Sequence, residues 1–194
     1  YILAEAGFRP IVIERGSRVE KRTCDVQKFW QSGILNPKSN VQFGEGGAGT
    51  FSDGKLNTSV KDPSGRNRLV LETFVRFGAD PSILYDNKPH IGTDVLSEVI
   101  VNMREFLVDK GTTFIFDTCV SNLDIVSNKL LSVYTDSDSN SEIKTDVCVL
   151  ALGHSARDTF DMLYNKGFDM ECKSFAVGFR VEHPQHMIDE SQYG

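Results

Sequence analysis

A run of glycines at Gly44–Gly49 constrains the fold of this chain more than any other feature. Residues 43–56 read Phe-Gly-Glu-Gly-Gly-Ala-Gly-Thr-Phe-Ser-Asp-Gly-Lys-Leu, so four of the six residues from Gly44 to Gly49 are glycine. Glycine loses more backbone entropy on folding than any other residue, so this density indicates a structural requirement. One such requirement is the close approach of backbone N–H groups to an anion such as a phosphate. A flexible surface loop is the alternative, but the neighbouring hydroxyl, carboxylate and amine groups favour a binding loop.

Two familiar phosphate-binding motifs match this stretch in letters but not in context. Gly44-x-Gly46-x-x-Gly49 fits the dinucleotide fingerprint, which must follow an apolar strand and open a helix. Here the polar residues 37–40 precede it and the turn-forming residues 50–59 follow it. Gly49-x4-Gly54-Lys55 fits the loop of nucleotide triphosphatases, but Leu56 stands where Ser or Thr must hold Mg²⁺. A phosphotransferase that uses this loop is therefore a disfavoured alternative.

Composition and charge exclude several classes of protein. The chain has 194 residues, 40% of them apolar and 25% charged, which is ordinary for a globular protein. A net charge of −6 argues against nucleic acid or an anionic membrane as a partner. No apolar run is long enough to span a membrane, and no signal peptide is present, so we expect a cytoplasmic protein.

The cysteines and histidines predict neither a metal site nor a redox disulfide. Cys24, Cys119, Cys148 and Cys172 are widely spaced and form no Cys-x-x-Cys pair, so we expect four reduced thiols. The four histidines do not have the spacing of metal ligands either. Without a cysteine pair, the chain is not expected to be a disulfide reductase.

The N-terminal residues resemble the second half of a βαβ nucleotide-binding unit. Residues 1–7 read as the last turns of an amphipathic helix closed by Gly7, and residues 9–14 read as a buried parallel strand. An acidic residue at the end of such a strand accepts hydrogen bonds from a ribose hydroxyl. Glu14 stands at that position. The alternative is that Glu14 is merely the polar residue at which the strand reaches the surface.

Apolar spacing predicts four further helices or helical segments. The clearest is 94–110, with a stripe formed by Leu96, Val99, Ile100, Met103, Phe106 and Leu107. A second helix at 66–77 has Leu69, Val70, Phe74 and Phe77 on one side. A short helix and loop are expected within 21–35. A fourth helix runs to about Lys166, opened by a capping box between Ser155 and Asp158.

Strands are expected mainly in the second half of the chain. Residues 112–126 are rich in β-forming side chains and are broken near Cys119, and residues 130–135 pair back across the turn at 127–129. The continuous apolar run at the end of 144–152 predicts a strand buried on both faces. Residues 175–181 alternate apolar and polar side chains, which predicts a half-buried strand of another sheet.

Several motifs in one order resemble the two-domain FAD-dependent oxidoreductases. These motifs are Ile11–Gly16, Gly44–Thr50, the meander at 112–147 and Val149–Asp158. Within that class, Phe43–Leu56, His90–Asp94 and Phe175–Pro184 are similar to a bacterial group of FAD-dependent dehydrogenases whose nucleotide-binding domain is of the glutathione-reductase type.

The resemblance implies an α/β fold. It consists of a partial Rossmann-like FAD-binding domain, with a parallel sheet, helices and a β-meander crossover, followed by the start of a mixed-sheet substrate domain. The implied boundaries are 1–60 for the first part of the FAD-binding domain and 61–111 for a helical or substrate-domain segment. Residues 112–160 return to the FAD-binding domain, and residues 161–194 begin the substrate domain.

The resemblance also assigns residues to an FAD site. Glu14 is expected at the adenosine ribose, the glycine loop along the pyrophosphate, and Val120 at the adenine through its backbone. Ala151 and Gly153 are expected near the cofactor, although Gly153 alone could be a simple turn glycine. The implied cofactor-binding residues are Glu14, Arg15, Gly16, Gly46, Gly47, Ala48, Gly49, Thr50, Val120, Ala151 and Gly153.

The expected function is an FAD-dependent oxidoreductase acting on an unidentified small molecule, with NAD(P)H as a candidate partner. Arg180 and His183 are weak catalytic candidates, and a solvated sheet edge is the alternative reading of both. A non-catalytic dinucleotide-binding protein or an inactive fragment is the main competing hypothesis. The resemblance places the first glycine loop of the family before Tyr1 and its C-terminal part after Gly194. We therefore expect a truncated fragment that by itself binds FAD weakly and tends to aggregate.

Overall fold

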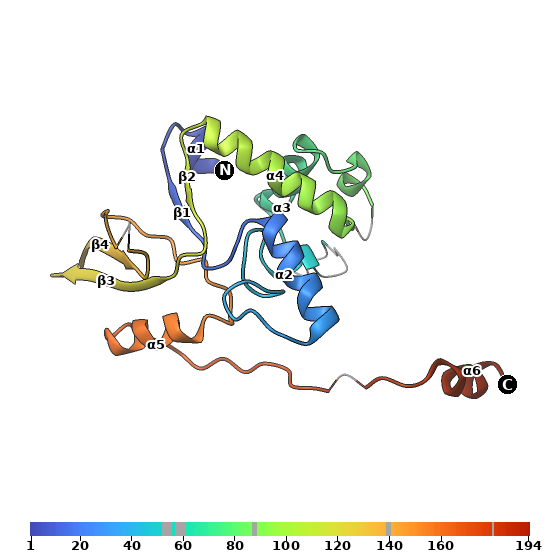
Figure 1. Cartoon of the computed structure of the whole chain (residues 1–194). Coiled ribbons are helices and arrows are strands. Elements are labelled where there is room, and N and C mark those ends of the chain that lie inside the picture. Colours follow the sequence, from blue (N-terminus) through green and yellow to red (C-terminus); the bar gives the residue numbers. More distant parts are fainter. Residues whose placement is uncertain (52–55, 57–60, 87–88, 139–140, 180) are drawn as a thin grey trace.

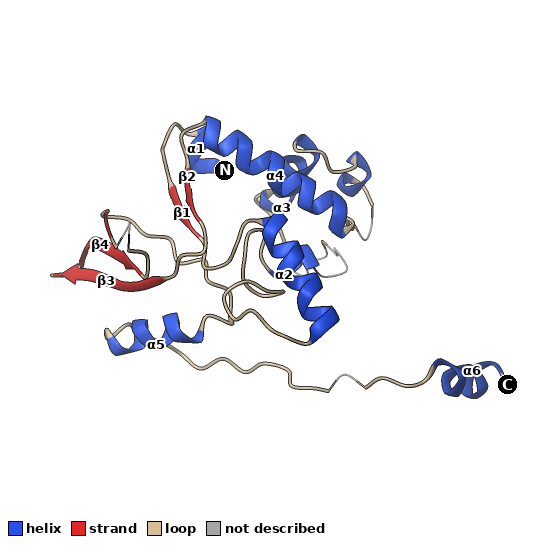
Figure 2. Ribbon diagram, in the orientation of Figure 1, coloured by secondary structure: helices blue, strands red, loops and turns tan. Residues whose placement is uncertain are grey.

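The chain folds into a mixed α/β body with two small sheets (Figures 1 and 2). The computed structural model describes residues 1–51, 56, 61–86, 89–138, 141–179 and 181–194. The helices are α1 (Ile2–Glu5), α2 (Val19–Ser32), α3 (Arg66–Arg76), α4 (Thr93–Asp109), α5 (Arg157–Asn165) and α6 (Gln185–Tyr193), with short 3₁₀ turns η1 (Ala48–Phe51) and η2 (Pro81–Leu84). The strands are β1 (Ile11–Ile13), β2 (Thr113–Ile115), β3 (Val120–Val126), β4 (Lys129–Thr135) and β5 (Glu142–Lys144).

β1 and β2 form a parallel pair, as expected for the strand at 9–14, but the expected burial is wrong, because Ile11 and Val12 are exposed. Ile11 pairs with Thr113 and Ile13 with Ile115. The ladder extends beyond the strands, because the Glu14 amide donates to the Ile115 carbonyl at 2.9 Å. The long crossover between these strands contains α2, α3 and α4, as parallel pairing requires. Glu14 therefore stands at the C-terminal end of a parallel strand, as the sequence predicts.

β3, β4 and β5 form an antiparallel meander. The predicted break near Cys119 is confirmed, since β2 ends at Ile115 and β3 begins at Val120. The predicted hairpin is also confirmed. Ser127 and Asn128 both have positive φ, 51° and 61°, which is the conformation of a two-residue type I′ turn.

The left-handed backbone conformation of Ser127 leads to a first testable prediction. Serine pays a steric cost of roughly 1 kcal/mol in this region, whereas glycine does not. Ser127→Gly is therefore expected to raise the free energy of unfolding in urea by up to about 1 kcal/mol. Ser132→Gly, at a paired position inside strand β4, is the control, and it should lower stability instead. A loss of stability in Ser127→Gly equal to that of the control would contradict the turn assignment.

One hydrophobic core lies between α3, η2 and α4. Its buried side chains are Phe77, Ala79, Ile83, Ile91, Leu96 and Val99. The predicted stripe of α4 is confirmed, because each of its six apolar side chains is either buried or packed against this cluster. The predicted face of α3 is wrong in part. Leu69 and Val70 are 44% and 49% exposed, while Leu71 and Val75 pack inward beside Phe74.

A second core joins α5 to the meander. Leu163 of α5 packs with Leu123 of β3 and Val133 of β4. The helix expected to end near Lys166 is confirmed, but its capping box is wrong. Ala156 is the N-cap, and the Asp158 carboxylate accepts from Arg15 at 2.6 Å and from the Thr159 amide at 2.9 Å, not from Ser155. The helix begins one residue later than a box opened by Ser155 requires, so Asp158 occupies the second helical position and not the third.

Two expected strands are absent from the described residues. The strand predicted at 144–152 is formed only up to Lys144, and Val147 and Val149 are more than 70% exposed. Residues 175–179 are irregular, and Phe179 is 96% exposed. Both segments have the right composition for strands, but no described strand lies beside them to complete a ladder. Burial and pairing, not propensity, decide strand formation at such positions.

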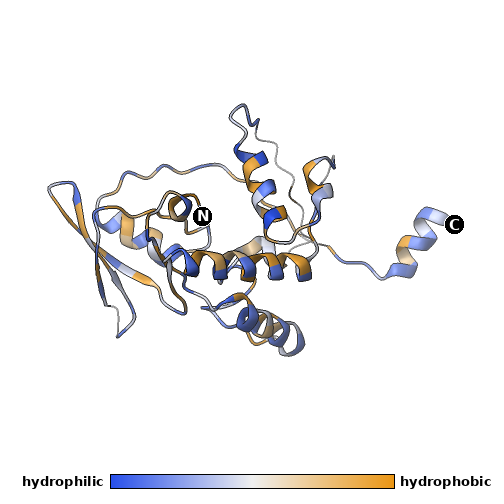
Figure 3. Ribbon diagram, turned by 90° about the horizontal axis from the view of Figure 1, so that it is seen from above, coloured by the Kyte–Doolittle hydropathy of each residue, from blue (hydrophilic) through white to orange (hydrophobic). Residues whose placement is uncertain are grey.

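The C-terminal residues form an extended arm. Figures 1 and 3 show it leaving α5 and ending in α6, away from the rest of the body. Helix α6 was not predicted from the sequence, because Pro184 argues against helix at the neighbouring histidines. Proline is in fact its N-cap, and the helix begins one residue later. None of the nine residues of α6 is buried.

Candidate ligand-binding cleft

Five segments that are far apart in the sequence converge on one cleft of about 300 Å³. They are the end of β1, the glycine loop, the turn before β3, the loop before α5 and the first turn of α5. Seven of the residues expected to bind a cofactor line this cleft: Glu14, Arg15, Gly47, Ala48, Val120, Ala151 and Gly153. The pattern of convergence, rather than any single residue, marks the cleft as the candidate site.

The Glu14 carboxylate organises the floor of the cleft. Its Oε1 accepts hydrogen bonds from the amides of Gly16 at 2.8 Å and Gly44 at 2.9 Å. Among the described residues, none donates a hydrogen bond to Oε2. The side chain is half-buried, so one oxygen fixes two backbone segments and the other remains available to a ligand hydroxyl.

Gly16 and Gly44 approach each other so closely that neither tolerates a side chain. A Cβ added to Gly16 would lie 2.6 Å from the Cα of Gly44 and 2.9 Å from the Lys38 carbonyl oxygen. A Cβ added to Gly44, where φ is 124°, would lie 2.3 Å from Cδ of Arg22. Gly16 does not line the cleft itself. It permits the contact that places Glu14 and the glycine loop side by side.

The glycine loop has a defined, hydrogen-bonded conformation and is not a flexible linker. Gly46 and Gly47 have positive φ, 87° and 67°. A Cβ on Gly46 would strike Thr50 Oγ1 and Ile100 Cδ1, at 2.2 Å and 2.4 Å. Thr50 is fully buried beneath the loop and does not reach the cleft. Gly49 has open space around it, so its assignment to the site gains no geometric support.

A buried arginine that the sequence did not single out holds the loop from inside. Arg22 of α2 is fully buried. Its Nε donates to the Asn40 carbonyl at 2.8 Å, and Nη1 donates to the carbonyls of Gly44, Glu45 and Gly47 at 3.2, 2.7 and 2.8 Å. In the sequence it is one of several charges on a mixed helix, and nothing in that pattern distinguishes it from a solvated residue.

Glu45 ties the same loop to two helices. Its Oε2 accepts from the Val19 amide at 2.8 Å and from Arg104 Nη1 at 2.6 Å. Arg104 also pairs with Glu20 at 2.5 Å, so α4, α2 and the loop share one ionic network. Burial raises the pKa of Glu45, although the hydrogen bond from Val19 and the charge of Arg104 oppose the shift. The glycine loop is therefore anchored through the Glu45 carboxylate as well as through its carbonyl contacts with Arg22.

Arg15 closes one side of the cleft. Its guanidinium pairs with Asp158 at 2.6 Å and lies 4.7 Å from the centre of the Phe43 ring. A second cavity of about 250 Å³ adjoins the cleft here and shares Arg15, Cys119 and Val120 with it. Lys38 and Asp136, which pair at 2.9 Å, line its far side.

The Arg15–Asp158 pair makes a modest prediction about acid stability. The hydrogen bond from Arg15 lowers the pKa of Asp158, so the pair stabilises the fold above the unfolded pKa of aspartate, near 3.8, and is lost as the pH falls further. Because the Asp158 side chain is 61% exposed, the contribution is at most about 0.5 kcal/mol. Asp158→Asn should therefore leave stability at pH 7 nearly unchanged and flatten its decline below pH ~4. An unchanged acid dependence, measured by urea unfolding across that range, would remove this role.

Of the two weak catalytic candidates, His183 does not line the cleft. His183 lies in the extended arm, is exposed, and lines none of the cavities found among the described residues. Arg180 lies outside the described residues, as do Gly54 and Lys55 of the triphosphatase motif. Within the described part of the chain, no group of three or more His, Cys, Asp or Glu side chains is placed to hold a metal ion. All four cysteines are free thiols, as expected.

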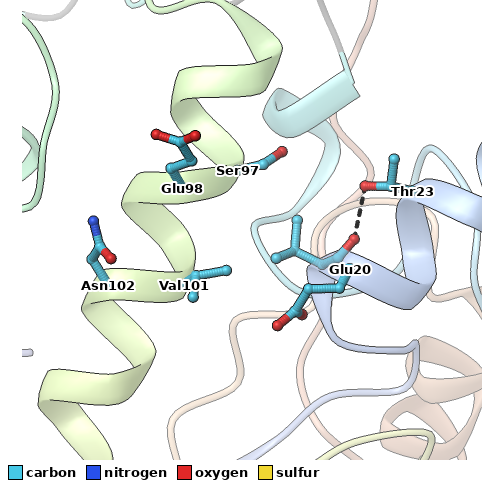
Figure 4. Close-up of a pocket in the computed structure, with 7 residues that line it drawn as sticks. Glu20, Thr23, Ser97, Glu98, Val101 and Asn102 are labelled. Carbon is cyan, nitrogen blue, oxygen red and sulfur yellow. Dashed lines mark hydrogen bonds between the residues drawn. The ribbon is translucent and has the colours of Figure 1, made fainter.

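A separate groove of about 340 Å³ lies between α2 and α4 (Figure 4). Ser97 and Val101 point from α4 toward Glu20 and Thr23 of α2. The Thr23 hydroxyl is already bonded to the Val19 carbonyl at 2.8 Å. None of the residues expected to bind a cofactor lines this groove, so it is distinct from the cleft at Glu14.

Comparison with known proteins gives a relative but no function. An uncharacterized protein of Clostridium beijerinckii is 46% identical over 192 residues, which is 99% of this chain and 35% of that protein. The chain therefore spans about a third of the length of that relative. No family model matches the chain. Among its described helices, none is long and apolar enough to cross a membrane.

Proposed function

We propose that the cleft binds FAD and that the protein containing it is an FAD-dependent oxidoreductase. The observation that carries this proposal is the convergence of Glu14, the glycine loop, Val120 and Gly153 on one cleft. Motifs in separate parts of the sequence predict that these residues bind a single ligand. Their assembly around one space supports the proposal.

Glu14 is the proposed ribose ligand. It lies at the C-terminal end of a parallel strand, which is where dinucleotide-binding sheets place an acidic residue. Its Oε2 is free to accept from a ribose hydroxyl, while Oε1 holds Gly16 and Gly44 in place. In this proposal, β1 and β2 belong to a Rossmann-like sheet and β3–β5 form its meander crossover.

Val120 and the loop at Ala151–Gly153 form the opposite wall. Val120 begins β3 and lines the cleft beside Cys119. Gly153 has a φ of 65° and open space around its Cα, so it offers bare backbone to a ligand. The adenine is assigned to the wall at Val120, and the remainder of the cofactor to the glycine loop and Gly153.

FAD would supply the hydride chemistry, and the chain would bind and orient it. A small-molecule substrate and NAD(P)H are the proposed partners. His154 and Cys119 also line the cleft, but no contact ties either to a reaction, so no catalytic residue is assigned. The substrate-binding role of residues 161–194 remains part of the proposal.

Anaerobic reduction tests the enzymatic part of the proposal. The protein mixed with FAD should accelerate bleaching of the flavin absorbance by NADH or NADPH over that of free FAD. Saturable FAD binding without any acceleration would favour the competing hypothesis of a non-catalytic dinucleotide-binding protein. Absence of FAD binding at millimolar concentrations would contradict both.

A further inference from the structure

Resting on the proposed dinucleotide site, we propose that Arg22 is the positioning residue that turns the glycine loop into a diphosphate-binding nest. Arg22 does not touch the ligand in this proposal. It holds the carbonyls of the loop inward, and the amides of the same peptide units are thereby turned outward to an anion.

The first step is the direction of the peptide groups. In a trans peptide unit the C=O and N–H bonds point in opposite directions, and the described residues contain no cis peptide. The Glu45 and Gly47 carbonyls both accept from Arg22 Nη1, at 2.7 Å and 2.8 Å. The N–H groups of Gly46 and Ala48, which belong to the same two units, therefore point away from Arg22.

The second step is that these two amides are unoccupied. Among the described residues, neither the Gly46 nor the Ala48 N–H has an acceptor, and both residues are exposed. Gly47 and Ala48 line the cleft itself. The intervening Gly47 amide donates to the Gly44 carbonyl at 3.1 Å, so the concave anion site consists of the alternate amides of Gly46 and Ala48.

The third step is the charge behind the nest. Within the described part of the chain, Arg22 forms no ion pair, and its Nη2 is buried without a partner. Glu45 contacts Arg22 only through its backbone carbonyl, and neither its carboxylate nor that of Glu14 forms an ion pair with the guanidinium. Its guanidinium thus lies in a poorly solvated interior, held by neutral carbonyls and by the face of Phe51 at 4.8 Å. A positive charge in such a place is screened little by water and favours an anion at the loop surface.

Amide NMR spectra of the ¹⁵N-labelled chain provide the test, because they report weak binding residue by residue. Inorganic pyrophosphate and ADP should shift the Gly46 and Ala48 amide resonances, whereas adenosine should shift those near Glu14 and Val120 only. Pyrophosphate that leaves Gly46 and Ala48 unmoved while adenosine still binds would overturn the role of the nest. Adenosine and ADP that both fail to perturb the cleft would instead defeat the proposed function.

Two variants test Arg22 itself. Arg22→Gln should reduce the preference for ADP over adenosine by about tenfold or more, while Arg22→Lys keeps part of it. Arg18→Gln is the matched control, since it removes the same charge from an exposed arginine at the start of the same helix. An ADP preference unchanged in Arg22→Gln, or reduced equally in Arg18→Gln, would overturn the proposal.

A measurement on the unmodified protein covers the case in which Arg22→Gln fails to fold. The Arg22 Nε–H is buried and bonded to the Asn40 carbonyl, so it should give a slowly exchanging resonance. Its assignment follows from its disappearance in Arg22→Lys. Pyrophosphate should shift this resonance and adenosine should not; a resonance that responds to neither would contradict the coupling between Arg22 and the nest.

Discussion

Gly16→Ala is expected to lower the free energy of unfolding by about 3 kcal/mol. The added Cβ would lie 2.6 Å from the Cα of Gly44, 2.7 Å from its amide nitrogen and 2.9 Å from the Lys38 carbonyl oxygen. All three are backbone atoms, which cannot rotate aside as a flexible side chain can. At the same place, the Gly16 amide donates a hydrogen bond to the Glu14 carboxylate. The clash should therefore displace the strand end and the glycine loop together.

Gly49→Ala is the matched control within the same region. No atom lies within 4 Å of a Cβ at Gly49, and its φ is not in the left-handed region. Stability should be unchanged or raised by up to about 1 kcal/mol, because alanine restricts the unfolded chain. Urea unfolding of both variants measures the difference. Equal stability of the two variants would show that the strand end and the loop are not in contact in solution.

Glu14→Gln is expected to weaken FAD binding by about 1–3 kcal/mol, or roughly 5- to 150-fold, while leaving the fold intact. The glutamine carbonyl can replace Oε1 as the acceptor for the Gly16 and Gly44 amides. Those two donors fix the orientation of the side-chain amide, so its NH₂ group must occupy the position of Oε2. A donor then faces the ribose hydroxyl where the carboxylate offered an acceptor.

Glu14→Ala separates the structural role of this residue from its binding role. It removes the acceptor for both backbone amides as well as the ribose contact, so it should lower stability by about 1–3 kcal/mol in addition to weakening FAD binding. Affinities come from flavin fluorescence titrations and stabilities from urea unfolding. An unchanged FAD affinity in Glu14→Gln would remove the ribose role, whatever the stability of Glu14→Ala.

The sequence predicted those elements whose evidence is local. The stripe of α4, the turn at Ser127–Asn128 and the end of β1 at Glu14 each follow from the spacing of a few neighbouring residues, and the structure confirms all three. Prediction from the sequence was wrong for segments whose secondary structure depends on pairing with another segment. Residues 147–152 and 175–179 have strand-forming composition, but strand formation requires a neighbouring strand, and none lies beside them in the described chain.

The sequence predicted several residues that line the cleft, but not the residues that hold the glycine loop in place. Glu14, Gly47, Val120 and Gly153 could be chosen from motif and order. Arg22 could not, because its role depends on four carbonyls that only the folded loop presents to it. The roles of Glu45 and Arg104 were missed for the same reason, since the pair is separated by 59 residues in the sequence.

The most direct test of the FAD site compares FAD with FMN, which lacks the adenosine half. In amide NMR spectra of the ¹⁵N-labelled chain, FAD and ADP should shift resonances of Glu14, Gly47, Val120 and Gly153, even if binding is weak. FMN at the same concentration should leave the resonances of Glu14 and Val120 in place. Equal shifts at Glu14 and Val120 with FMN, or FAD shifts confined to residues outside the cleft, would contradict the assignment of this cleft to the dinucleotide.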